Sequence, residues 1–379
     1  MPLVLTEEQE MLKESARGFL DEKAPVAALR KLRDTNDPNG FSRDLWKEMA
    51  EMGWAGIIVE EAHGGSDFGF VGAGVLAEEM GRTLTASPFL STSILAATAL
   101  KKLGSDAQKA ANLPKIAGGE ALYALAVDEH RKHGPAKIAM KAEKHGNGFK
   151  LSGDKTFVAD GHVADKIIVA ARSAGAAGEM NGLTLFLVDA KAKGISVERT
   201  QMVDSRNAAR IKFDGVEATG DDVLGEVDGG YMALEGVLNA GRAGLAAEMS
   251  GSAQQAFEMT VNYLKERKQF GTEIGSFQAL QHRAAHLYSE VELMKSAVLK
   301  ALQDLDAHYG MAGPICSLAK AKAGEVAKLA SQEAVQMHGG IGMTDEFDIG
   351  FYMKRIRVAQ EMFGDAAFHA DRLAQMRGY

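Results

Sequence analysis

The order of hydrophobic and polar positions changes twice along this chain. Up to about residue 117, and again beyond about residue 230, apolar residues recur at the three- and four-residue spacing of helices. Between about 120 and 216 they alternate with polar residues or form short apolar runs, as in strands. Because each periodicity marks one kind of element, the pattern predicts a helical N-terminal domain (1–118), a β middle domain (119–224) and a helical C-terminal domain (225–379).

Local signals mark several helix ends in the first domain. Thr6 with Gln9, and Ser105 with Gln108, have the spacing of a capping box, in which two side chains satisfy the free N–H groups of a first helical turn. An amphipathic helix is predicted from Ser42 and ends at Gly53, since glycine commonly follows the last helical turn.

The middle domain is predicted as a set of short strands. Lys137–Glu143 and Phe149–Lys155 flank a glycine-rich turn, which predicts a hairpin. Further apolar strands are expected at 167–171, 183–188 and 210–216. Short strands at such close spacing are typical of a β-barrel or sandwich.

Beyond the middle domain the pattern predicts four long helices joined by short connections. They cover about 231–267, 276–308, 314–336 and 344–376. Long helices with short connections favour a four-helix bundle. The predicted fold class is therefore α+β, with helical, β and four-helix-bundle domains in that order.

Composition narrows the class of protein. The chain has 379 residues, 46% hydrophobic and 25% charged, and a formal net charge of −8. The acidic balance argues against nucleic acid or an anionic membrane as partner. No secretion signal or membrane-spanning run is recognisable, so a cytoplasmic protein is expected. The single cysteine, Cys316, excludes an internal disulfide, and we expect a small buried core residue there.

The most informative stretch runs from Tyr263 to Gln281. Arg267, Gln269 and Phe270 are predicted on a helix that stops at Gly271, and Gln278 near the start of the next helix. A guanidinium offers a planar fork that matches diphosphate oxygens. The same residues in isolation are also typical of a solvated helix surface with one core phenylalanine.

A second polar stretch follows about 55 residues later. It contains Gln336, Gly339 and Gly340 at positions i, i+3 and i+4. Paired glycines at a helix end allow a ligand to approach the backbone closely. Taken alone, this stretch is also typical of a simple glycine cap, but the two stretches in this order are more specific than either.

Together these residues resemble the flavin-binding signature of the acyl-CoA dehydrogenase family, and the three-domain order resembles that family over nearly the whole chain. The resemblance implies that Arg267, Gln269, Phe270 and Gln278 contact the diphosphate and adenosine end of FAD bound mainly by a neighbouring subunit. Gln336, Gly339 and Gly340 would come from the other side of the same interface. It further implies an oligomer, usually a dimer of dimers, an acyl-CoA substrate and an electron-transfer flavoprotein as acceptor.

The family's middle domain holds the flavin ring with two segments. Asp128 lies in the chain's counterpart of Thr-Glu-Pro-x-x-Gly-Ser, where Gly134 takes the place of the serine. Phe157 and Val158 lie in the counterpart of Lys-x-aromatic-Ile-Thr-Asn, where Ala159 replaces the threonine. The resemblance therefore implies contacts to the ring from Asp128, Phe157 and Val158, with fewer side-chain hydroxyls than usual.

The family's catalytic base is usually a glutamate in a Tyr-Glu-Gly-Thr segment. Counting from Gln336 without a gap, that position holds Phe363, and a shift of two residues brings Glu361 or Asp365 to it. A rarer base position precedes an arginine in the first bundle helix, but no acid precedes Arg242 here. Asp365 is the predicted base and Glu361 the alternative.

Three hypotheses follow for the reaction. The first is FAD-dependent α,β-desaturation of an acyl-CoA thioester. The second is a base-deficient, FAD-binding subunit of a heterotetramer, because the Phe363–His369 ending resembles a bacterial subgroup that includes small subunits of pimeloyl-CoA-type dehydrogenases. The third is another thioester reaction on the same scaffold. The sequence does not identify the acyl chain.

Overall fold

The computed structural model describes residues 2–379 and divides the chain into two compact units. One unit comprises 32–73 and 86–241 and contains the β-sheet. The other comprises residues up to 31, 74–85 and 242–379 and is helical apart from one small hairpin. The chain passes between the units within helices α2 (Val26–Asp34), α4 (Gly69–Thr83) and α7 (Gly230–Glu266), and once more just after α4, at Thr85.

The sheet unit combines short helices with eight strands. Its helices are α3 (Arg43–Glu51), α5 (Ala97–Leu103) and α6 (Asp106–Ala117), with a buried π-helical segment at Phe89–Ala96. Its strands are β1 (Tyr123–Ala126), β2 (Lys141–His145), β3 (Gly148–Ala159), β4 (Lys166–Arg172), β5 (Leu183–Asp189), β6 (Ile195–Gln201), β7 (Asn207–Ala218) and β8 (Val223–Leu224).

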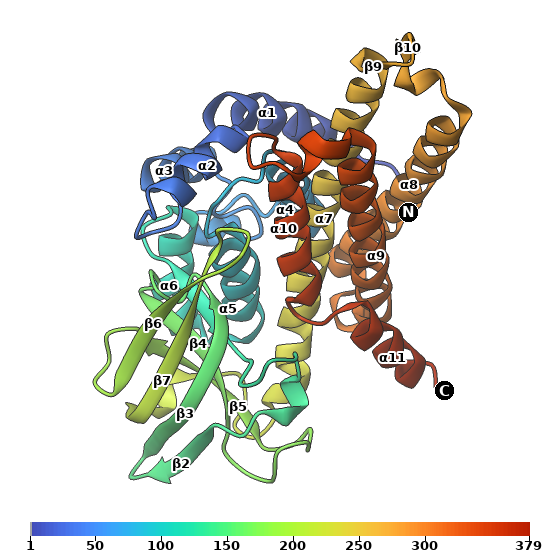
Figure 1. Ribbon diagram of the computed structural model, residues 1–379. Coiled ribbons are helices and arrows are strands. Elements are labelled where there is room, and N and C mark those ends of the chain that lie inside the picture. Colours follow the sequence, from blue (N-terminus) through green and yellow to red (C-terminus); the bar gives the residue numbers. More distant parts are fainter. Residues whose placement is uncertain (1) are drawn as a thin grey trace. The chain divides into compact units, whose positions relative to one another are not determined.

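The strands pair in the order β6-β7-β3-β2-β4-β5-β8, and β1 pairs with β4 (Figure 1). β4 and β5 are apolar and buried along nearly their whole length, as expected for strands covered on both faces. β3 and β7 are long, antiparallel and interrupted by a register shift between Lys155 and Val158. That irregularity lies at the predicted ring-facing segment and changes the course of β3 there.

The predicted β2–β3 hairpin is confirmed, but its first strand begins later than predicted. Pro135–Lys137 forms a single 3₁₀ turn, and β2 starts only at Lys141. The N–H groups of Ala139 and Met140 donate to the Glu129 carboxylate instead of to a neighbouring strand.

The helical unit packs long helices around small residues. Besides α1 (Glu7–Lys23) it contains α8 (Gln278–His308), α9 (Gly313–His338), α10 (Ile349–Glu361) and α11 (Ala366–Met376). α9 lies beside α8, α10 and α11 (Figure 1). Ala256, Ala334 and Ile349 are fully buried together, so α7, α9 and α10 share one core. The predicted α+β class and helical C-terminal domain are confirmed.

Two predicted helix bounds in this unit are wrong. α7 ends at Glu266, and the residues after it form a hairpin of β9 (Lys268–Gln269) and β10 (Thr272–Glu273). The predicted last helix is two helices, because the chain turns sharply between Glu361 and Ala366. Both breaks contain a Phe-Gly pair with positive φ, which an α-helix cannot include.

Several local predictions are confirmed. Both capping boxes form, with Gln9 N–H donating to Thr6 and Gln108 N–H donating to Ser105. Cys316 is fully buried, and burial raises the pKa of its thiol to about 12. Within residues 2–379, none of the helices combines the length and apolar character needed to cross a membrane.

Candidate functional site

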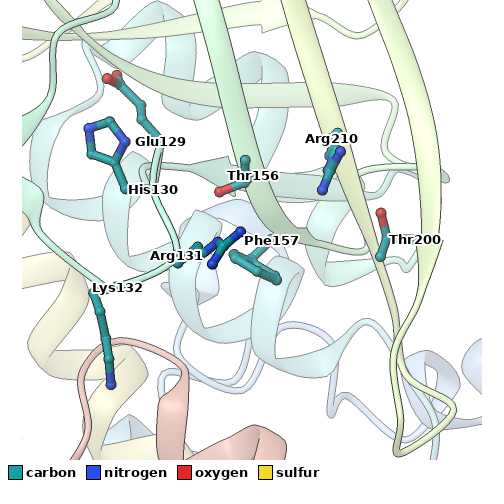
Figure 2. Close-up of a pocket in the computed structure, with 8 residues that line it drawn as sticks. All are labelled: Glu129, His130, Arg131, Lys132, Thr156, Phe157, Thr200 and Arg210. Carbon is teal, nitrogen blue, oxygen red and sulfur yellow. The ribbon is translucent and has the colours of Figure 1, made fainter.

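The sheet unit contains an open cleft of about 570 Å³ at one edge of β3 (Figure 2). Its lining combines cationic, hydroxyl and aromatic side chains from the loop before β2 and from β3, β6 and β7: Glu129, His130, Arg131, Lys132, Thr156, Phe157, Thr200 and Arg210. A volume of this size accommodates a small-molecule ligand.

A buried ion pair fixes the loop behind this cleft. Lys155 is completely buried, and its Nζ donates to Glu129 Oε1 at 2.8 Å and to the carbonyl of Val127 at 3.0 Å. Burial lowers the pKa of Lys155, while the neighbouring Glu129 carboxylate opposes that shift. The pair therefore holds the 127–129 segment against β3 and leaves Glu129 neutralised by its partner.

Asp128, a predicted ring contact, is engaged within its own loop. Its carboxylate accepts from His133 Nδ1 at 2.9 Å and from the N–H of Gly134 at 3.3 Å. Burial alone would raise the pKa of Asp128, but the hydrogen bond and charge of His133 lower it below its ordinary value. Its carbonyl accepts from Thr156 N–H at 2.7 Å, so Asp128 ties the loop to β3.

Phe157 and Val158, the other two predicted ring contacts, differ in how far their side chains are exposed. Phe157 has φ +53° and leaves 47% of its surface exposed in the cleft, an outlier for an aromatic residue. Strain of this kind persists where the surroundings hold it, commonly at binding sites. The Val158 side chain is buried at 1% exposure, so only its backbone remains for a ligand.

The helical unit contains the signature residues at the hairpin tip beyond α7. Gln269 and Thr272 pair across the strands, leaving Phe270 (φ +56°) and Gly271 (φ +81°) as a two-residue turn. Arg267 is exposed and its side chain makes no hydrogen bond or ion pair within residues 2–379. It precedes β9, and Phe270 lies in the hairpin turn, so the prediction that Arg267, Gln269 and Phe270 lie on a helix is wrong.

Phe270 projects almost completely into solvent. It is 92% exposed, and its nearest aromatic neighbour is Phe277, with ring centroids 6.2 Å apart. Gln278 is also exposed, at the first position of α8. An aromatic ring in solvent does not stabilise the fold of a single chain, so the tip is suited to contact another molecule.

The second signature stretch lies at the end of α9, as predicted. Gln336 is exposed, and neither Gly339 nor Gly340 has any atom within 4 Å of where a Cβ would lie. His338, which directly precedes Gly339, is buried and packs against Tyr263 of α7, with 4.4 Å between the ring centroids. The structure thus brings the helix ends of both signature stretches together through their aromatic residues.

The predicted base region is the turn between α10 and α11, which we call the 363–365 turn. Phe363 (φ +58°) and Gly364 (φ +106°) reverse the chain, and Phe363 is buried at 7% exposure. Asp365 follows as the N-cap of α11, accepting from Phe368 N–H at 2.8 Å. Glu361 forms an ion pair with Arg357 at 3.0 Å on the helix exterior.

Buried cations support the carbonyls of this turn. Lys320 Nζ donates to the carbonyls of Gln360 and Gly364, each at 3.0 Å. Arg242 Nε donates to the Phe363 carbonyl at 3.3 Å, and His369 Nε2 lies 3.1 Å from the same oxygen. All three side chains are at most 1% exposed. Burial, aided by the charge of Arg242, lowers the pKa of Lys320 to about 7.

Sequence reasoning missed several of these groups. Lys320 was not identified, and Arg242 was considered only as the marker of the rarer base position. Both lie among small apolar residues, on α9 and α7, and a cation inside an apolar stretch is the sequence signal that could have identified them. Arg131 and Arg210 were also missed, because exposed cations on a loop and a strand are ordinary in sequence.

The chain matches three family models along most of its length. They are the N-terminal domain of acyl-CoA dehydrogenase at residues 6–120, the middle domain at 129–216 and the C-terminal domain at 228–376. The match confirms the resemblance inferred from the signature residues.

Individual proteins agree with the family models. The mitochondrial short/branched chain specific acyl-CoA dehydrogenase of Bos taurus is 29% identical over 98% of this chain and 85% of its own. The 3-(aryl)acrylate reductase of Clostridium sporogenes is 30% identical over 94% of both chains. The acyl-CoA dehydrogenase structure from Geobacillus kaustophilus has a TM-score of 0.90 at 26% identity and 99% coverage of both chains. The chain therefore belongs to the acyl-CoA dehydrogenase family, whose members are FAD-dependent oxidoreductases that act on acyl-CoA.

Proposed function

We propose that this protein, as an FAD-loaded oligomer, removes the α and β hydrogens of an acyl-CoA thioester and passes the electrons to an electron-transfer flavoprotein. The observation that supports this most directly is the 363–365 turn. It presents an acidic residue, Asp365, within two positions of the family's usual base, on a backbone held by three buried side chains.

The chain's own groups fit the cofactor. Among the residues that the structure describes, the Arg267 guanidinium has no hydrogen-bond or ion-pair partner, which suits it to diphosphate oxygens, and Gly339 and Gly340 leave open space beside their backbone. Phe270 offers an exposed ring to an aromatic ligand or to a second subunit. Phe157, half exposed in the cleft, is the group suited to the flavin ring.

When bound, FAD supplies the two-electron oxidant for the hydrogen that leaves the β carbon. The protein must accept the α proton and orient the thioester. We propose that the Asp365 carboxylate accepts that proton. Glu361 is the weaker candidate, because its carboxylate is paired with Arg357 and is 38% exposed, so it is well solvated.

The oligomer follows from the exposed tip. The Arg267 side chain makes no hydrogen bond or ion pair within residues 2–379, and Phe270 remains 92% exposed beside Phe277. We propose that both side chains complete the cofactor site of a neighbouring copy. A dimer of dimers is the arrangement we expect. The electron-transfer flavoprotein is proposed from the family resemblance.

A second candidate has specific support. At the gap-free base position stands Phe363. Asp365, two residues later, is engaged as the cap of α11, directly after the Phe363 and Gly364 carbonyls that Arg242 and Lys320 hold. Cations and a helix N-terminus weaken a carboxylate as a base. This favours a base-deficient, FAD-binding subunit that pairs with a second dehydrogenase subunit. The reductase name of the Clostridium sporogenes relative shows that dehydrogenation is not the only reaction among similar chains.

The base assignment is tested by replacing Asp365 with asparagine in the purified, FAD-loaded protein. Asparagine caps a helix as well as aspartate, so Asp365→Asn removes the carboxylate and keeps α11. We expect dye reduction by acyl-CoA to fall roughly 10²- to 10⁴-fold. Glu361→Gln is the matched control and should retain activity. Wild-type rates in Asp365→Asn would rule out this base.

The cofactor assignment has a separate measurement. Arg267→Ala is expected to lose FAD on gel filtration while its unfolding curve stays unchanged, because the side chain is exposed and makes no hydrogen bond or ion pair within residues 2–379. Wild-type FAD content would count against the tip as a cofactor contact.

The acyl chain and the two candidate functions are addressed by one screen. The purified chain is assayed against straight, branched, dicarboxylic and ring-containing acyl-CoA thioesters, alone and co-expressed with neighbouring dehydrogenase subunits. Activity of the chain alone excludes the second candidate. Activity only in the co-expressed complex favours it.

A further inference from the structure

The last residue of α9 is a buried histidine that joins three parts of the helical unit. The ring of His338 is 3% exposed and lies between two aromatic rings, Tyr263 of α7 at 4.4 Å and Phe347 at 4.6 Å between ring centroids. The 3₁₀ turn Gly339–Met343, which we call the 339–343 turn, folds back onto it. A Cβ placed at Gly342 would lie 3.0 Å from His338 Cβ.

The 339–343 turn depends on this contact beneath it. Within the turn only Gly342 is buried, whereas Ile341 and Met343 are 42% and 82% exposed. Gly342 packs on His338 and on the Val335 carbonyl of the same helix. The position of the turn is therefore set largely by the ring that ends α9.

The two ring nitrogens of His338 have different surroundings. Nδ1 lies 2.7 Å from the carbonyl oxygen of Ala334, and because a carbonyl only accepts, Nδ1 carries the proton of the neutral ring. Nε2 is buried and has no hydrogen-bond partner within residues 2–379. A second proton, placed on Nε2, would have no acceptor among these residues, and an unpaired buried charge is costly.

No neighbouring charge offsets such a proton. In the part of the chain that the structure describes, no carboxylate lies within 4.0 Å of the His338 nitrogens. Four carboxylates on the elements packed against the ring are instead held by arginines: Glu258, Glu333, Asp345 and Asp348. The other charged side chains there are exposed: Lys265, Glu266, Arg267, Lys328 and Glu346. Tyr263 and Phe347 contribute uncharged rings.

Burial lowers the pKa of His338 below its ordinary value, and the hydrogen bond to the Ala334 carbonyl opposes only part of that shift. When the 339–343 turn opens, water reaches the ring and the ordinary pKa returns. The open form then binds a proton more readily than the closed form. Opening therefore becomes easier as the pH falls below about 6.5, and above that pH it does not depend on this ring.

We propose that His338 is an acid-sensitive latch: the neutral ring holds the 339–343 turn closed, and protonation of Nε2 by solvent releases it. The turn contains Gly339 and Gly340, two of the proposed cofactor contacts. Acid would thus loosen the cofactor site and the subunit interface together. That consequence rests on the proposed function, whereas the latch rests on the packing of His338 alone.

Hydrogen–deuterium exchange of the full-length protein, with and without FAD, measures the latch directly. Amides of residues 339–343 are followed from about pH 7.5 to about pH 5, with rates corrected for the pH dependence of exchange in unfolded peptides. His338→Gln keeps a donor for the Ala334 carbonyl but cannot titrate. His338→Phe keeps an aromatic ring at this position. His286→Gln, at an exposed histidine of α8, is the matched control.

In the unmodified protein and in His286→Gln, the equilibrium constant for opening should rise by up to about tenfold per pH unit below pH 6.5. In both His338 variants it should stay constant to within about twofold. If His338→Gln is already open at neutral pH, the response of His338→Phe decides. A histidine that only fills space predicts the same curve for all four proteins, and that result overturns the proposal. Amides of buried β5 report global unfolding.

The consequence for the cofactor has its own measurement. Retained FAD and subunit association are compared at about pH 7.5 and pH 5.5. Both should fall further in the unmodified protein than in His338→Phe. Unchanged FAD content despite acid-dependent exchange upholds the latch and removes its link to the cofactor. If the unmodified protein binds no FAD at either pH, the proposed function is wrong, and the exchange measurement still decides the latch.

Discussion

The hairpin tip and the 363–365 turn contain the same two residues, and in both places each residue has a positive φ. Phe270 and Gly271 have φ of +56° and +81°, and Phe363 and Gly364 have +58° and +106°. Phe270 is 92% exposed and Phe363 is 7% exposed. The tip is closed by pairing between adjacent residues, whereas the turn depends on Arg242, more than 100 residues away, and on Lys320.

This difference separates two kinds of functional segment. A two-residue hairpin turn with positive φ at both positions favours Asn-Gly, so Phe270 is a costly choice for the chain alone. The cost points to a contact outside the chain. The 363–365 turn is instead stabilised from within, so its geometry is set before any ligand arrives.

The largest expected effect comes from adding one methyl group to each glycine. In Gly364→Ala the new Cβ would lie 2.3 Å from Phe368 Cδ1, whereas at Gly271 nothing lies within 4 Å. Both changes force alanine to a positive φ, at about 1–2 kcal/mol. The overlap adds about 1–3 kcal/mol at Gly364 alone. Urea denaturation should show a larger loss for Gly364→Ala, and equal losses would mean that the turn is not confined as described.

The next largest effect is the pH dependence of stability that comes from Lys320, the buried side chain that donates to the 363–365 turn. Lys320 has a pKa of about 7 in the folded protein, below its ordinary 10.5. Between those values the unfolded chain holds one more proton at this side chain, so the free energy of unfolding rises with pH. The expected slope is up to about 1.4 kcal/mol per pH unit.

Lys320→Met removes that slope and also the two hydrogen bonds to the turn. Unfolding free energies of both proteins from pH 7 to 10 provide the measurement, because shared titrations cancel in the difference. Parallel curves would show that Lys320 remains charged when folded.

The smallest effect is expected at the tip. Phe270→Asn places the preferred residue in the hairpin turn, so the stability of the single chain should stay equal or rise by at most about 1 kcal/mol. Sedimentation should nevertheless show weaker association, since the exposed ring is gone. Unfolding must be followed at several protein concentrations, because association itself stabilises the fold. Unchanged association would remove the tip from the interface.

Sequence predictions succeed where the interacting residues are neighbours in the chain and fail where they are far apart. The capping boxes at Thr6 and Ser105 were predictable because both partners lie within four residues. The end of α7 was placed too late, since Arg267 to Gln269 are good helix formers and only Gly271 signals a break. The helix and turn preferences of the individual residues do not predict a hairpin that lacks the usual Asn-Gly turn.

The candidate site shows the stronger limit. Met362 and Phe363 continue the apolar pattern of α10, so the break there was hidden. The support from Lys320 and His369 depends on which helices pack together, and spacing along the chain does not contain that information. The family resemblance supplied the cofactor, but it could not supply these contacts.

The burial of Cys316 has a practical consequence. It is the only cysteine of the chain, fully covered, with a thiol that stays protonated at neutral pH because its pKa is about 12. Maleimide reagents react with exposed thiolates, so the native protein offers them almost no target. A cysteine placed at Gln269 would therefore be labelled selectively, and a fluorophore there would report directly when the hairpin tip meets its partner.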